Sequence, residues 1–338
     1  MDKKPILKNL NKFSNIKLAR GVNLLNLSSV SRSHDELRYL GVSTKTFGKN
    51  WFVLPDKSKA IFKSYDFSSS LGLKKLRIIN EVLCYQLAKQ VGMPCARYEP
   101  AHIQNKVGLI SYNFLKKGET LKTLHELLKV DKVLDSNLSD TLNALEMYGD
   151  YGYNYNKKEI LKELFKFIVF DTITIQSDRH SNNIHFIFNE KKSEIKLAPA
   201  FDNEFAFSID LIYNNYKNDK STLEKSIDDV RKDYSKWAKY FTILEELRSP
   251  RNAFINNVHN ICAMAKADKE LGKVLNNILD NINPSEAFKV LENNDYKISK
   301  EYKEFVETVV SENVKIIRSE LENVNQEDTE YFKEEIIR

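Results

Sequence analysis

Three polar side chains lie in two short segments whose residue types suit phosphoryl transfer. Asp178 and Asn183 fall in the polar loop 176–183, and Asp202 follows after a further pair of strand-like stretches. Such transfer needs one carboxylate to orient or deprotonate the attacking hydroxyl, and a carboxylate and an amide oxygen to hold Mg²⁺ on the phosphates. The order base, amide, hairpin and metal-binding carboxylate is the order found in kinases. These residues are the first candidates for a site.

Taken alone, the spacing from Asp178 to Asn183 carries little weight, because turn residues fill any loop. Nearby alternatives are weaker still. Asp171, on an apolar helix, is most simply a helix-face or loop-bracing carboxylate, and Ser177 has no histidine arrangement that would make it a nucleophile. The predicted hairpin and Asp202 strengthen the interpretation of Asp178 and Asn183 as part of a phosphoryl-transfer site.

A second, independent set lies upstream. Lys63 ends an apolar strand-like run that starts at Ala60, and Glu81 lies in the middle of the following amphipathic helix. A strand lysine normally extends to water, and a mid-helix glutamate normally faces solvent. Together, however, they reproduce the ion pair that holds a lysine against the α- and β-phosphates of ATP.

The elements that must position the upstream set are strands and one helix. Residues 49–54 and 60–65, separated by a polar break that starts at Pro55, predict a β-hairpin. Apolar residues then recur at helical spacing, which predicts a helix over 71–91 that stops at Gly92 and Pro94. Two further stretches have strand character: 98–103 and 106–112.

Beyond residue 119 nearly all of the chain has helical periodicity, with one exception. Residues 184–188 and 194–199 predict a second short hairpin, directly between the polar loop and Asp202. The composition shifts near 113–119, which places a boundary there. The predicted helices span 120–130, 136–147, 158–176, 221–247, 250–265, 268–282 and 299–323.

Length and composition exclude several classes of protein. The chain has 338 residues with a formal net charge of +5, too dilute for a direct nucleic-acid binder. Its three cysteines, Cys84, Cys95 and Cys262, have no zinc or disulfide-framework spacing, which favours a reducing compartment. We expect no Sec signal, because lysines and asparagines interrupt the apolar residues of the N-terminus, and no membrane span, because no stretch approaches 18 uninterrupted apolar residues.

These motifs resemble the HipA-like Ser/Thr protein kinases, above all their compact members. The similarity is carried by Ala60–Lys63, the run Asn80–Pro94, the loop Ser177–Asn183 and the segment Leu197–Asn203. It implies an α+β, two-lobed protein kinase-like fold with a small β-containing N-lobe and a mostly helical C-lobe. The corresponding division is an N-terminal extension over 1–40 that partly packs on the N-lobe, an N-lobe over 41–115 and a C-lobe over 116–338.

The resemblance also implies roles for individual residues. Asp178 would be the catalytic base, Asn183 and Asp202 the Mg²⁺ ligands, Lys63 the phosphate-binding lysine and Glu81 its partner. His180 either approaches the phosphates or is a satisfied loop histidine, and the backbone from Tyr112 to Phe114 would form the hinge that binds adenine. Asp202 is followed by Asn203-Glu204 in place of the usual Phe-Gly, which these kinases tolerate.

The expected phosphate loop departs from the usual patterns. The segment Gly41–Asn50 is neither G-x-G-x-x-G nor a Walker A motif, because six residues separate its glycines and Asn50 follows Lys49. HipA-like kinases also have an irregular loop here, so its backbone N–H groups would still cradle phosphates. The alternative is a surface turn. The candidate nucleotide-binding residues in this loop are Ser43, Thr44, Lys45 and Gly48.

The sequence therefore predicts an ATP- and Mg²⁺-dependent, autophosphorylating kinase that acts on a Ser or Thr hydroxyl of a protein substrate. Two alternatives stay open. The string Asp178-Arg179-His180-x-x-Asn183 is also similar to phosphoinositide kinases, which act on lipids, and a pseudokinase or regulator would bind nucleotide without turnover. A DNA-binding antitoxin partner is doubtful, because the full N-terminal subdomain of HipA is not recognisable. The expected location is the cytoplasm, or outside the cell as an effector exported by a non-Sec route.

Overall fold

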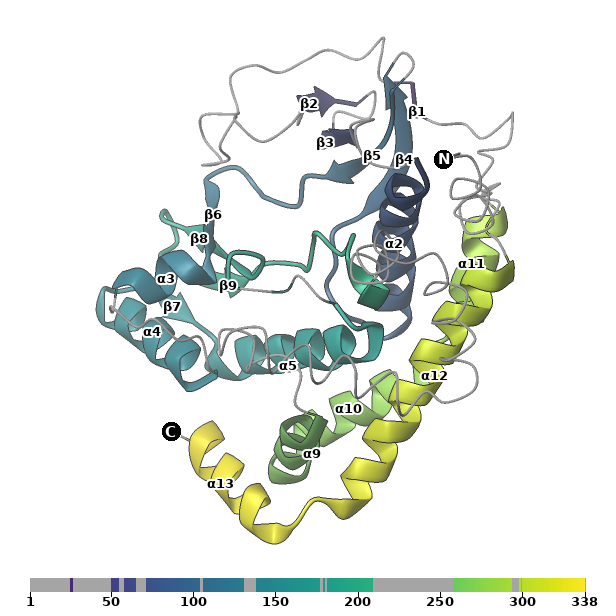
Figure 1. Ribbon diagram of the computed structural model, residues 1–338. Helices are drawn as coiled ribbons and strands as arrows, with labels where there is room; N and C mark the ends of the chain where they lie inside the picture. Colours follow the sequence, from purple (N-terminus) through teal and green to yellow (C-terminus); the bar gives the residue numbers. More distant parts are fainter. Residues whose placement is uncertain are drawn as a thin grey trace, which may run out of the picture.

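The computed structural model describes residues 25–26, 50–54, 58–64, 71–103, 106–130, 138–176, 179, 181–208, 258–293, 298 and 300–337. Its N-terminal part is a five-stranded sheet in the order β1-β4-β5-β3-β2, with one long helix, α2, beside it (Figure 1). The elements of this part are β1 (Leu25–Asn26), β2 (Asn50–Val53), β3 (Lys59–Ser64), α2 (Leu71–Gln90), β4 (Tyr98–Ile103) and β5 (Lys106–Tyr112).

The predicted elements of this part are confirmed. β2 and β3 form the expected antiparallel hairpin, in which Val53 pairs with Lys59. α2 ends where expected, because Gly92 adopts the left-handed φ of 63° that glycine tolerates best, and the Met93 N–H returns to the Ala88 carbonyl at 2.9 Å. Within the N-terminal extension, β1 pairs in parallel with β4, and the rest of 1–40 lies outside the described residues.

The second sheet has four strands in the order β6-β8-β9-β7. It contains the predicted second hairpin, β8 (His185–Asn189) with β9 (Glu194–Leu197), together with β6 (Glu119–Thr123) and β7 (Asn154–Tyr155). The prediction of helix over 120–123 was wrong: this stretch pairs with β8, which satisfies its backbone groups in a sheet. The helix begins after Thr123, whose side chain and backbone exchange hydrogen bonds with Glu126 in a capping box.

The rest of the described chain is mostly helical, as predicted. The strand β7 and the helices α11 and α13 were not predicted as separate elements. Helix 221–247 and the start of helix 250–265 lie outside the described residues. The helices are α3 (Leu124–Val130), α4 (Leu138–Asp150), α5 (Lys157–Thr174), the 3₁₀ turn η3 (Ala206–Ser208), α9 (Val258–Ala267), α10 (Lys269–Asn281), α11 (Pro284–Asn293), α12 (Lys300–Asn323) and α13 (Gln326–Ile337).

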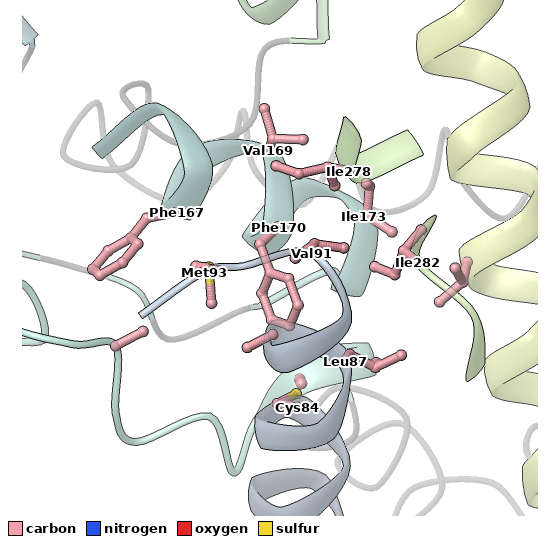
Figure 2. Packing of buried hydrophobic residues seen from close by; sticks show 14 of the residues in the cluster. Cys84, Leu87, Val91, Met93, Phe167, Val169, Phe170, Ile173, Ile278 and Ile282 are labelled. Atoms are coloured by element: carbon pink, nitrogen blue, oxygen red, sulfur yellow. The ribbon is translucent and has the colours of Figure 1, made fainter. Parts of the chain in front are cut away.

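The main hydrophobic core joins α2 to the helical part. Figure 2 shows Leu87 of α2 and Val91, the residue after the helix, packed among Phe170 and Ile173 of α5 and Ile278 of α10. Phe170 and Ile173 are fully buried, and burial of each such side chain contributes about 1.5–3 kcal/mol. This core fixes the spacing between α2 and the C-terminal end of α5.

None of the helices in the described part of the chain combines the length and apolar character that a bilayer-spanning segment requires.

The packing of α13 on α9 should depend on pH. His259 of α9 lies between two carboxylates, with Nδ1 2.6 Å from Glu320 of α12 and Nε2 2.8 Å from Asp328 of α13. The hydrogen bond to Glu320, and then that to Asp328, raises the pKa of His259 above its usual 6.5. The stabilisation that protonated His259 gives to the packing of α13 is therefore complete below about pH 6.5, and it is lost as the pH rises through the raised pKa of His259.

Hydrogen exchange of the α13 amides, corrected for intrinsic rates, should show protection that falls as the pH rises above 6.5 in the wild type. His259→Gln should remove that pH dependence. Equal pH dependence in both proteins would contradict the assignment.

Candidate active site

Three charged side chains from distant parts of the chain meet at one point. The Lys63 amine at the end of β3 lies 3.1 Å from Oε1 of Glu81 on α2, and it also contacts Oδ1 of Asp202. Glu81 is fully buried, whereas the side chains of Lys63 and Asp202 are 13% and 29% exposed. The structure thus brings together the two sets of residues that the sequence analysis treated separately. We call Lys63, Glu81 and Asp202 the ion triad.

The surroundings of the ion triad restrict the Lys63 amine. It lies 5.7 Å from the centroid of the Tyr98 ring on β4, within the range of a cation–π interaction. Burial raises the pKa of Glu81, and the attraction to Lys63 opposes that rise. A buried carboxylate of this kind favours a cation beside it, so Lys63 does not extend freely to water.

The backbone at Asp202 adopts an unusual conformation that the neighbouring residues hold. Its φ is 58°, in the left-handed region, which Asp tolerates better than most residues. The Asp202 N–H donates to the Tyr98 hydroxyl at 3.0 Å, and the Gln176 amide donates to the Asp202 carbonyl at 3.5 Å. Such conformations persist where the surroundings over-determine them, often at functional sites.

Asn203 connects the ion triad to the rest of the site. Its backbone N–H donates to Oε2 of Glu81 at 2.8 Å, so the second oxygen of that buried carboxylate is also satisfied. Its side-chain oxygen accepts from Arg179 at 2.5 Å, and its amide nitrogen donates to the Cys95 sulfur at 3.6 Å. The sequence analysis gave Asn203 no role beyond replacing the usual Phe.

Arg179 is the centre of a second buried network, which the sequence analysis missed. Its guanidinium bonds both carboxylate oxygens of Asp171 on α5, at 2.9 and 3.3 Å, and both side chains are 2% exposed. The same group donates to the carbonyls of Phe201 at 2.7 Å and Asn183 at 3.4 Å. Of the two interpretations of Asp171, a helix-face carboxylate or a loop-bracing one, the structure therefore supports the second. An aspartate on an apolar helix face, followed by an arginine in the next loop, is the signal that could have found this pair.

Arg179 connects the backbones of the two segments that carry the predicted metal ligands. One guanidinium nitrogen bonds the carbonyl of Asn183 and that of Phe201, the residue before Asp202. The predicted base Asp178 and His180, together with Ser43, Thr44, Lys45 and Gly48 of the expected phosphate loop, lie outside the described residues.

The donor set suits Mg²⁺ on a nucleotide. Among the described residues no group of three or more His, Cys, Asp or Glu side chains forms a metal cluster. Mg²⁺ bound with a nucleotide, however, uses one or two protein carboxylates and completes its shell with phosphate and water oxygens. Asp202, a partly exposed carboxylate beside a lysine, and Asn183 supply oxygen donors of the required kind.

The expected hinge follows β5. The Tyr112 N–H donates to the Arg97 carbonyl at 3.0 Å, and the Asn113 N–H donates to the Lys59 carbonyl at 2.8 Å, so both donors are already used. The Phe114 N–H has no hydrogen-bond partner in the described part of the chain. The Phe114 ring packs on Phe201, with 5.9 Å between centroids, which links this segment to Asp202.

Comparisons with known proteins show the family of the chain and a similar fold. Residues 40–269 match the model of the HipA-like C-terminal domain family. The fold is similar to that of the proinflammatory kinase CtkA of Helicobacter pylori, with a TM-score of 0.61 and 15% identity over 89% of this chain and 100% of that chain. This likeness confirms the predicted two-lobed, mostly helical α+β fold.

A second structure, HipA of Shewanella oneidensis MR-1 in complex with HipB and operator DNA, matches at a TM-score of 0.39 and 13% identity. That match covers 82% of this chain and 60% of the HipA chain. No curated protein matches the sequence.

Breaking the Arg179–Asp171 pair should destabilise the protein strongly. Arg179→Met leaves a buried, uncompensated carboxylate, so we expect a loss of about 3–5 kcal/mol in the free energy of unfolding, measured by urea denaturation. The matched control is Arg318→Met, because Arg318 is 2.6 Å from Asp280 in an exposed pair. That control should lose at most about 1 kcal/mol.

The double variant Asp171→Leu/Arg179→Met should recover part of the loss, because it removes both buried charges. Equal effects of Arg179→Met and Arg318→Met would contradict the role of the buried pair.

Proposed function

The chain belongs to the family of HipA-like C-terminal domains, and on this premise we propose that it is a Ser/Thr protein kinase that uses Mg-ATP. The observation that carries the proposal is the ion triad, in which Lys63 joins Glu81 to Asp202. Phosphoryl transfer depends mainly on positioning and charge stabilisation, with little covalent chemistry for the protein to perform. A lysine held between two carboxylates from different elements meets that requirement.

Lys63 would bind the α- and β-phosphates. Both oxygens of Glu81 are occupied, one by the Lys63 amine and one by the Asn203 N–H, so Glu81 is fixed and in turn fixes the amine. A cation oriented before the substrate arrives costs no reorganisation during the reaction. This is the physical basis for the role of Lys63 in the proposed activity.

Asp202 and Asn183 would hold the metal. When bound, Mg²⁺ would supply the positive charge that neutralises the charge developing on the phosphates. Asp202 supplies a carboxylate whose backbone is fixed by Tyr98, and Arg179 ties the Asn183 backbone to the same segment.

Asp178 would align the acceptor hydroxyl and take its proton. Two residues close to Asp178 in the sequence are anchored. Gln176, two positions before it, donates its N–H to the Asp171 carbonyl at 2.9 Å, and Arg179, directly after it, is held by the Asp171 side chain. A positioned general base contributes about 10²–10⁴ in rate. Adenine would bind against the segment that contains Phe114, the hinge residue whose N–H has no partner among the described residues.

Two rival functions make different predictions. A lipid kinase, suggested by the string Asp178-Arg179-His180-x-x-Asn183, would label phosphoinositides and no protein. A nucleotide-binding pseudokinase would bind Mg-ATP and label nothing. The proposed kinase would also label itself, with Ser208, Ser221 and Thr222 as the first acceptors to inspect, because they follow Asp202.

The first test is transfer of radiolabelled phosphate from Mg-ATP to generic protein acceptors, followed by phosphoamino acid analysis. The wild type should label serine or threonine. Asp178→Asn and Asp202→Asn should each lower the rate by at least about 10²-fold, because each removes a group that acts on the reacting atoms.

The matched control is Asp280→Asn, the same substitution at an exposed aspartate on α10. It should transfer phosphate at the wild-type rate. Wild-type rates in either site variant, with circular dichroism unchanged, would exclude the proposed mechanism. Labelling of phosphoinositides alone would replace it with lipid kinase activity.

Nucleotide binding can be tested separately from turnover. Mg-ATP at 100 times its dissociation constant should stabilise the wild type by about 2.7 kcal/mol, visible as a rise in Tm. Lys63→Met should lose most of this rise, because it removes the phosphate-binding cation. A rise in the wild type without transfer to any acceptor would support the pseudokinase, and an undiminished rise in Lys63→Met would place the nucleotide elsewhere.

A further inference from the structure

The long helix α12, which precedes α13, contacts both elements that carry the candidate active site, although none of the site residues belongs to it. Near its start, the buried Tyr302 hydroxyl donates to the side-chain oxygen of Asn80 on α2. Three turns later, Asn313 donates to the carbonyls of Ile173 at 2.9 Å and Thr172 at 3.3 Å, at the end of α5. In Figure 1, α12 extends from beside α2 past the end of α5.

The contact at Asn80 reaches the ion triad in two ways. Asn80 is the residue before Glu81, and its amide nitrogen donates to the carbonyls of Ala206 at 2.8 Å and Glu204 at 3.2 Å. One side chain therefore ties the turn of α2 that carries Glu81 to the segment that follows Asp202. Asn80 is completely buried, so its hydrogen bonds cannot be replaced by water.

Two backbone carbonyls determine the orientation of the Asn80 amide. If the amide were flipped, its oxygen would face the carbonyl oxygens of Glu204 and Ala206, and its nitrogen would lose two acceptors. Burial raises the pKa of Tyr302 well above its usual value, so the hydroxyl keeps the proton that it donates. In the orientation that the carbonyls determine, the amide oxygen accepts this hydrogen bond from Tyr302.

The contact at Asn313 supports the loop side of the site. Thr172 and Ile173 are among the last residues of α5, whose carbonyls lack partners within the helix. The chain turns out of α5 at Ile175, with φ 45°, and continues to Arg179. By bonding the final carbonyls, Asn313 fixes the point from which this loop starts.

We propose that α12 is a brace that holds α2 and the end of α5 in the relative position the active site requires, with Tyr302 and Asn313 as positioning residues. The two contacts are eleven residues apart, roughly 16 Å along the helix axis. Loss of either contact loosens one side of the site and leaves its charged groups in place. The role in phosphoryl transfer rests on the proposed function, whereas the mechanical coupling does not.

The test compares Tyr302→Phe, which removes one hydroxyl, with the control Ile317→Val. Ile317 is a core residue of α12 on the side that faces α9, where its carbonyl accepts a hydrogen bond from Cys262. Hydrogen exchange followed by mass spectrometry reads the amides of Asp202, Asn203 and Ala206. We expect about tenfold faster exchange in Tyr302→Phe, the effect of one buried hydrogen bond, and wild-type exchange there in Ile317→Val. Urea midpoints show whether both variants lose comparable global stability.

Phosphate transfer is measured on the same proteins. Tyr302→Phe should lower kcat/KM for ATP by about tenfold, whereas Ile317→Val should leave it unchanged. Asn313→Ala provides a second variant, with faster exchange expected at Gln176. Unchanged exchange at 202–206 in Tyr302→Phe, or equal acceleration in Ile317→Val, overturns the brace. If the wild type transfers no phosphate, the proposed function fails, and the exchange rates still decide the brace.

Discussion

The site depends on the burial of one carboxylate. Glu81 has no exposed surface, and an ionised group in that position is tolerated only when both of its oxygens are paired. The partners are the Lys63 amine, on the strand directly before the helix in which Glu81 lies, and the Asn203 N–H, in a segment 122 residues after Glu81. Satisfying this single charge therefore requires that the N-terminal sheet, α2 and the segment after β9 all be in place.

A second buried carboxylate, Asp171 on α5, imposes the same condition on the other side of the site. It recruits Arg179, which in turn orders Asn183, Phe201 and Asn203 through carbonyl and amide contacts. Asn203 bonds both networks. The hydrophobic core between α2 and α5, seen in Figure 2, sets the spacing between the two carboxylates. Apolar packing thus fixes the distance between the two buried carboxylates, and the burial of their charges determines which groups pair with them.

Local patterns were sufficient to find the two hairpins, the strands β4 and β5, the helices α2, α5 and α12, and the candidate residues Lys63, Glu81 and Asp202, because periodicity and residue type are properties of the sequence itself. Interactions between side chains distant in the sequence were not predictable in the same way. Asn80 looks like any polar helix residue, and its partner Tyr302 is 222 positions away. The strand β6 was misassigned as helix because its pairing with β8 overrides its local preference. Arg179 was missed because a loop arginine is normally exposed, and only the burial of Asp171 explains its position.

The separation between Asn80 and Tyr302 has a consequence during synthesis. At typical rates of about 5–20 residues per second, a ribosome needs roughly 10–40 s after adding Asn80 before it adds Tyr302. Throughout that interval the nascent chain contains the residues of the ion triad but lacks one of the hydrogen bonds that hold the segment after Asp202. Completion of the site is therefore delayed until Tyr302 has been translated, so a product terminated before that residue would carry the charged residues without the support that orders them.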